Sequence, residues 1–120
     1  MNGWIGVDLD GTLAEYTKWQ GIRHFGQPII PMVLRIKMWL DEGIEVRIFT
    51  ARVAGLEGDE LHAFTVALHK WLAIEAMLPP LQATNVKDFN MLELYDDRAV
   101  QVELNTGKLV GYSTRERGLE

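Results

Sequence analysis

The sequence predicts an α/β fold with a mainly parallel central sheet flanked by helices. Short apolar runs that end at polar turns alternate with longer segments of helical period. This alternation favours parallel strands joined by right-handed crossovers. The chain has 120 residues, a length that suits one domain. We expect that domain to span residues 1–112, with a flexible tail at residues 113–120.

Composition narrows the classes of function. The net charge of −5 argues against a broad, non-specific nucleic-acid surface, although a local basic groove stays possible. The chain has no cysteine, which excludes disulfides, thiolate metal sites and cysteine nucleophiles. No apolar run approaches the roughly 20 residues that a membrane helix needs. The N-terminus has no signal-peptide pattern, so we expect a cytoplasmic protein without a membrane partner.

The first half of the chain predicts two strands and a helix between them. Residues 4–9 form an apolar run typical of a buried parallel strand. Residues 14–28 have no clear period and are expected to form a loop or small flap. Pro31 suits the first turn of a helix, and Gly43 suits its C-terminal end. Residues 44–49 then alternate between apolar and charged, which predicts the second strand.

The second half predicts a long helix and further strands. Asp59 is expected to cap the helix, and the prolines at 79–80 end it. Residues 83–86 form a weak strand, and residues 91–95 form a second apolar stretch. Residues 100–104 and 109–112 flank an Asn-Thr-Gly turn, so a terminal hairpin is expected over residues 100–112.

Polar side chains follow every strand predicted in the sheet. In open α/β sheets, ligands bind at the carboxyl ends of the strands. Clustered carboxylates repel one another unless a cation neutralises them, and hard oxygen ligands favour Mg²⁺. A bound Mg²⁺ and a lysine would hold a phosphoryl group, which a neighbouring carboxylate can attack. In chain order the residues are Asp8 and Asp10, Thr50 and Arg52, Lys87, and Asp96 and Asp97.

The same residues resemble the motifs of the haloacid dehalogenase (HAD) superfamily. Residues 8–13 match its Asp-x-Asp-Gly-Thr signature, and Phe49–Thr50 resembles its second motif. Lys87 fits the third motif and Asp96–Asp97 the fourth, in the same order along most of the chain. The resemblance implies a Rossmann-like fold and a Mg²⁺-dependent phosphatase that forms an aspartyl-phosphate.

The resemblance also implies a role for each acidic residue. Asp8 is the nucleophile and a metal ligand. Asp10 lends its backbone carbonyl to the metal, while its side chain protonates the leaving group and then activates water. Asp96 and Asp97 bind Mg²⁺, directly or through water, and the sequence leaves open which of them is the inner ligand.

The remaining candidates concern the substrate. The resemblance implies that Thr50 hydrogen-bonds the phosphoryl oxygens and that Lys87 pairs with the phosphate and the nucleophile. Arg52 is a candidate ligand for the substrate phosphate, with a surface arginine as the alternative. Tyr16 and Trp19 follow the first motif closely and are expected to line the entrance of the site.

The spacing of the motifs leaves no room for a separate cap domain. The segment from Thr12 to Thr50 already contains a helix and a strand, and the segment from Thr50 to Lys87 is mostly one helix. The chain therefore resembles capless HAD members, whose open site admits a small or a macromolecular phosphorylated substrate, or is closed by another subunit.

Hydrolysis of a phosphate monoester is the leading interpretation, with two alternatives. The first is a nucleic-acid or nucleotide end-processing phosphatase or phosphotransferase, which the negative charge disfavours mildly. The second is a non-catalytic phosphate- or partner-binding module on the same fold.

Overall fold

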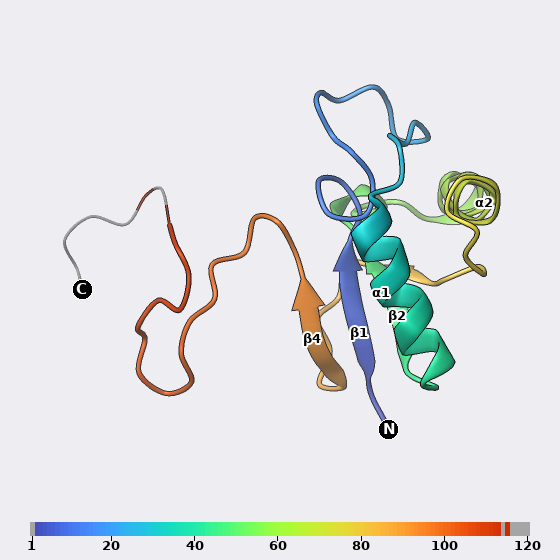
Figure 1. The fold of residues 1–120 in the computed structure, drawn as a ribbon. Helices are drawn as coiled ribbons and strands as arrows, with labels where there is room; N and C mark the ends of the chain where they lie inside the picture. The colour runs from blue at the N-terminus through green and yellow to red at the C-terminus, as the bar shows by residue number, and fades with distance from the viewer. Residues whose placement is uncertain (1, 114, 116–120) are drawn as a thin grey trace.

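The computed structural model describes residues 2–113 and 115, and within them four parallel strands form one sheet in the order β3-β2-β1-β4 (Figure 1). The small α/β fold with a parallel sheet is therefore confirmed. The strands are β1 (Trp4–Asp8), β2 (Glu45–Phe49), β3 (Ala83–Thr84) and β4 (Met91–Tyr95). The helices are α1 (Ile30–Asp41) and α2 (Gly58–Ile74), with a short 3₁₀ turn, η1 (Ala51–Val53), between β2 and α2.

The register of the sheet brings the predicted site residues to one edge. Asp8, the last residue of β1, pairs with Phe49 of β2, and Val7 pairs with Tyr95 of β4. Because all these pairs are parallel, the residues that follow β1, β2 and β4 emerge side by side. The central position of β1 gives Asp8 a neighbouring strand on each side.

The helix boundaries confirm some local predictions and correct one. Pro31 lies in the first turn of α1, and Gly43, with φ of 80°, follows its last turn. The prediction that Asp59 caps the long helix is wrong. Glu57 occupies the N-cap position of α2 without a side-chain cap bond, and Asp59 lies within the first turn. There its charge still suits the positive end of the helix dipole.

The core lies between both helices and one face of the sheet. Its strand residues alternate, since Val46 and Ile48 of β2 point into it while Arg47 does not. Both helices therefore cover the same face, as two right-handed crossovers in one direction require. The helical core residues are Met32, Val33, Ile36 and Trp39 of α1 and Phe64, Leu68, Trp71 and Leu72 of α2.

The chain is less regular after α2 than predicted. β3 has two residues and ends at Thr84 rather than at Val86. The terminal hairpin is reduced to one antiparallel bridge between Val102 and Leu109, without strands. The segment of residues 100–112 runs away from the sheet (Figure 1) and is almost wholly exposed. An isolated two-stranded hairpin is marginal in water.

The predicted tail at residues 113–120 lies outside the described residues except for 113 and 115. Within the described part of the chain, neither helix combines the length and the apolarity needed to cross a bilayer.

Candidate functional site

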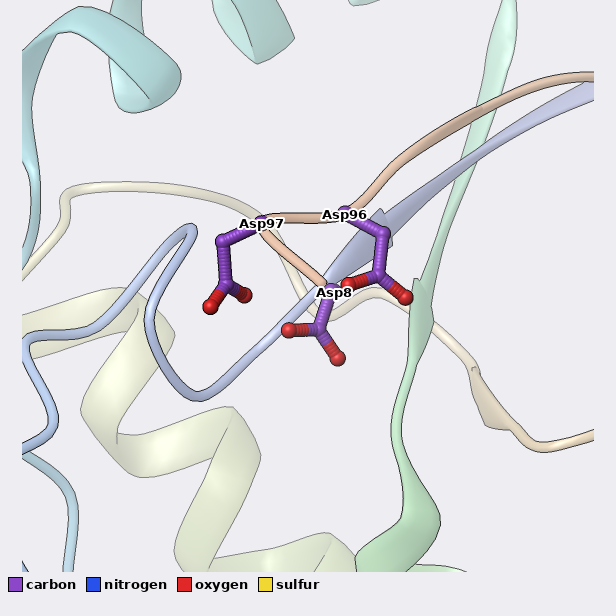
Figure 2. Close-up of side chains that lie close together, drawn as sticks. All are labelled: Asp8, Asp96 and Asp97. Atoms are coloured by element: carbon purple, nitrogen blue, oxygen red, sulfur yellow. The ribbon is translucent and has the colours of Figure 1, made fainter. Parts of the chain in front are cut away.

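Three carboxylates converge at the edge of the sheet (Figure 2). Asp8 comes from the end of β1, and Asp96 and Asp97 come directly after β4. One oxygen from each of the three lies within 4.8 Å of the others. Asp8 and Asp96 are half-buried, whereas Asp97 is exposed. The structure thus brings together the acids of the first and last predicted motifs, which are far apart in sequence.

Burial and the neighbouring acids both raise the pKa of the Asp8 carboxyl. Burial is the largest cause that raises the pKa of the Asp8 carboxyl, and hydrogen bonding to Asp97 follows. The charges of the neighbouring carboxylates, first Asp96, raise it further, to about 8. A cation among these groups would oppose the repulsion and favour the ionised form of Asp8.

The donor set fits a hard divalent ion. All three ligands are carboxylates, the oxygen donors that Mg²⁺ prefers, and the chain has no cysteine to attract softer metals. Mg–O bonds of about 2.0–2.1 Å place opposite ligands about 4 Å apart. The spacing of the cluster is of that order, so Asp8, Asp96 and Asp97 would hold the ion with small side-chain adjustments.

The turn after β1 fixes Asp97 in place. The Thr12 hydroxyl donates to Asp97 Oδ1 at 2.9 Å and accepts from the Asp97 backbone N–H at 3.0 Å. Gly11 has φ of 92°, and a Cβ atom there would lie 2.6 Å from Asp97 Oδ2. Gly11 and the Thr12 hydroxyl therefore let the turn after β1 pack closely against Asp97.

Asp10 lies outside the acidic cluster and pairs with Arg52. The Arg52 Nε donates to Asp10 Oδ2 at 2.9 Å, and its Nη2 donates to Asp10 Oδ1 at 2.7 Å. The side chain of Arg52 is only 6% exposed, whereas that of Asp10 is 24% exposed. The alternative of a surface arginine is wrong. Long-range pairing across β1 and β2 buries this guanidinium.

Arg52 also holds the loop of residues 14–28. Its Nη1 donates to the carbonyls of Gly21, Ile22 and His24 at 3.3, 2.9 and 2.7 Å. The guanidinium carbon lies 5.0 Å from the centre of the Trp19 ring and 4.9 Å from that of Phe25. Most of its N–H groups therefore have partners inside the protein, which leaves little capacity to bind phosphate directly.

Thr50 is 2% exposed and caps the turn that carries Arg52. Its hydroxyl oxygen accepts the Arg52 backbone N–H at 3.1 Å. A hydroxyl can accept and donate at the same time, so its proton stays available to an oxygen of a ligand. Capping and the predicted phosphoryl contact are thus compatible.

A cavity of about 450 Å³ joins these groups. Its volume falls within the range of small-molecule sites. Asp8, Asp10 and Thr50 line it together with Tyr16 and Trp19, the predicted entrance residues. The other lining residues are Gly11, Ala51, Arg52, Asp97 and Arg98.

Of the predicted site residues, Asp96 and Lys87 do not line this cavity, and Lys87 also lies outside the acidic cluster. Lys87 is exposed and, within residues 2–113 and 115, enters no ion pair. Because β3 ends at Thr84, Lys87 lies three residues beyond the sheet edge. Its role as a phosphate ligand stays a prediction from the resemblance.

Thr12 and Arg98 contribute to the site through their own contacts but were not among the predicted site residues. Thr12 supports Asp97, and the signature motif that contains it was the available signal. Arg98 lines the cavity, and its backbone N–H donates to Asp96 Oδ1 at 2.8 Å. Its position next to the acidic pair was visible in the sequence, but nothing there indicated the direction of its side chain.

Comparisons with protein-family models, curated proteins and solved structures find no match to this chain.

Proposed function

We propose that this chain is a Mg²⁺-dependent phosphatase that hydrolyses a phosphate monoester through an aspartyl-phosphate on Asp8. The observation that carries the proposal is the convergence of Asp8, Asp96 and Asp97 within 4.8 Å of one another, beside a cavity that Asp10 and Thr50 also line. These are residues of the first, second and fourth motifs that resemble the HAD superfamily.

The cluster would hold Mg²⁺ through the side chains of Asp8, Asp96 and Asp97, and the resemblance adds the backbone carbonyl of Asp10. When bound, the ion would supply positive charge to the phosphoryl oxygens and to the carboxylates around them. That charge would keep Asp8 ionised, which a nucleophilic carboxylate requires.

The proposed reaction has two steps. First, an Asp8 oxygen bonds to phosphorus while the bond from phosphorus to the ester oxygen breaks, and Asp10 gives a proton to the departing alkoxide. Then water attacks the phosphorus of the aspartyl-phosphate, Asp10 takes the water proton, and Asp8 leaves as a carboxylate. The products are an alcohol and inorganic phosphate, and the enzyme returns to its starting protonation.

The open cavity beside Asp8 would admit either a small phosphate ester or a larger ester that extends out of the site. The proposal places Thr50 at the phosphoryl oxygens and Tyr16 and Trp19 beside the alcohol part of the substrate. The half-exposed rings, 49% and 56% exposed, offer apolar surface for that contact. Arg98 would supply positive charge at the same cavity.

A panel of phosphate esters assayed for phosphate release, with Mg²⁺ and with EDTA, tests the proposal. We expect release from at least one ester with Mg²⁺ and its loss with EDTA. The panel includes oligonucleotides with 3′-phosphates, so that an end-processing activity is detected. Absence of release from every ester would contradict the proposal and favour a non-catalytic binding module.

A further inference from the structure

Arg52 and Asp10 form a buried link between the sheet and the loop of residues 14–28. The guanidinium binds one carboxylate and three backbone carbonyls, all of which lie 28 to 42 residues away in sequence. A planar guanidinium presents its donors in fixed directions, so this set of partners fixes its orientation. We propose that Arg52 is a positioning residue, which holds the Asp10 carboxylate and the loop segment 21–24 in one arrangement.

The geometry leaves hydrogen-bonding sites on the Asp10 carboxylate that Arg52 does not occupy. A carboxylate has about four lone-pair sites, and a bidentate arginine uses one on each oxygen. The remaining sites keep fixed directions because the pair is held at 2.7 and 2.9 Å. Asp10 also lines the cavity that contains Asp8, so one of these sites can serve the ester oxygen. This part of the inference rests on the proposed function.

The loop is held from a second side, which makes the arrangement rigid. Trp71 of α2 donates from its indole Nε1 to the Gly26 carbonyl at 3.0 Å. Phe25 packs between Arg52 and the rings of α2, with its centre 5.7 Å from that of Trp71. At the base of the loop, Ala14 and Pro28 form an antiparallel bridge. Arg52 therefore connects segment 21–24 of this anchored loop to the side chain of Asp10.

The test uses leaving groups of different basicity. An alkyl phosphate needs a proton on its leaving oxygen, whereas p-nitrophenyl phosphate releases a stable phenolate without one. If Arg52 acts through Asp10, Arg52→Lys lowers kcat/KM for the alkyl ester by about 100-fold, the cost of a misplaced catalytic group. For the aryl ester, kcat/KM changes several-fold at most. The constant kcat/KM is used because it reports the steps through leaving-group departure.

The ratio of the two losses is insensitive to incomplete folding. Both esters are assayed on the same sample, so an unfolded fraction lowers both rates equally. Arg47→Lys is the matched control. Like Arg52, Arg47 stacks on an aromatic ring, that of Trp4, and pairs with carboxylates, those of Glu45 and Asp88. Unlike Arg52, it does not line the cavity. We expect that variant to keep the wild-type ratio.

A double-mutant cycle and a protease assay complete the test. In an Asp10→Asn background, Arg52→Lys adds little further loss on the alkyl ester, because the group it positions is already gone. Trypsin cleaves faster after the exposed Arg23 in Arg52→Lys, by roughly tenfold, the effect of losing one hydrogen bond to a charged group. Arg47→Lys leaves this cleavage unchanged.

Equal losses on the two esters, or full additivity with Asp10→Asn, would overturn the positioning role while leaving the proposed phosphatase intact. An unchanged rate of cleavage after Arg23 would overturn the link to the loop. A wild-type protein that releases no phosphate from either ester would contradict the proposed function instead. It would also contradict the role of Arg52 in positioning Asp10 as the acid and base.

Discussion

At the scale of single residues, the site depends on close approaches between distant segments. Thr12 and Gly11 bring the turn after β1 against Asp97, and Arg52 reaches Asp10 from the turn after β2. The sequence predicted that Asp8, Asp96 and Asp97 would lie close together, because strand ends and motif order are local features. It did not predict the burial of Arg52, since its partners lie 28 to 42 residues away and no periodicity records such contacts.

Gly11→Ala tests the approach of the turn to the acidic pair. The new Cβ would meet Asp97 Oδ2 at 2.6 Å, and φ of 92° disfavours any side chain. We expect a loss of about 1–3 kcal/mol in the free energy of unfolding from backbone strain and weaker Mg²⁺ binding from the displaced carboxylate. Urea unfolding and Mg²⁺ titration measure the two effects.

Gly55→Ala is the control for that substitution. Gly55 has φ of 76°, but a Cβ atom there meets nothing within 4 Å. This variant is expected to lose stability through strain alone and to keep the wild-type affinity for Mg²⁺. Equal Mg²⁺ affinities for the wild type and Gly11→Ala would show that the turn does not position Asp97.

At the scale of elements, local signals located most of the secondary structure. The apolar runs predicted β1, β2 and β4, and the signals at Pro31 and Gly43 predicted both ends of α1. The end of β3 was predicted wrongly, and the terminal hairpin was predicted with two strands where the structure has one antiparallel bridge. Both depend on whether a neighbouring element covers the strand, and the segment after β4 has almost no such cover.

Trp71→Phe tests how α2 supports the loop. The phenyl ring keeps most of the packing but cannot donate to the Gly26 carbonyl, which now receives the indole N–H at 3.0 Å. We expect a loss of about 1 kcal/mol in stability, the usual value of a hydrogen bond, together with faster tryptic cleavage after Arg23. Trp39→Phe is the control, because the ring of Trp39 packs on that of Tyr95, with ring centres 4.8 Å apart. Equal cleavage rates in the two variants would contradict the anchoring role of Trp71.

At the scale of the whole molecule, two helices on one face of a four-stranded sheet leave the carboxyl edge open. The loop of residues 14–28 is the segment that borders the cavity on the side of Tyr16 and Trp19. We expect the clustered acids at that edge to couple the stability of the fold to pH.

The contribution of Asp8 to the stability of the metal-free protein should fall as pH rises from about 4 to about 8. The pKa of Asp8 is raised to about 8 in the folded state, from an ordinary value of 3.8. Between these values the folded protein holds a proton that the unfolded chain has released, so the stabilising contribution is present below pH 4 and is lost through pH 8. Thermal unfolding in EDTA across this range measures the effect.

Asp8→Asn provides the reference for that measurement, because it removes the titrating group. We expect the wild type to lose more stability than the variant as pH rises. Mg²⁺ should raise the melting temperature of the wild type more at pH 8.5 than at pH 5.5, since its ligands must be ionised. Parallel pH dependences of wild type and variant in EDTA would contradict this description of the cluster.

The central claim is that Asp8 attacks phosphorus, and trapping with beryllofluoride tests it most directly. Beryllofluoride with Mg²⁺ mimics a phosphoryl group bonded to a carboxylate, and a crystal structure of the adduct identifies the bonded atom. We predict beryllium bonded to a carboxylate oxygen of Asp8, with Mg²⁺ beside Asp96 and Asp97, and no adduct in Asp8→Asn. An adduct on any other residue, or one that persists in Asp8→Asn, would contradict the assignment.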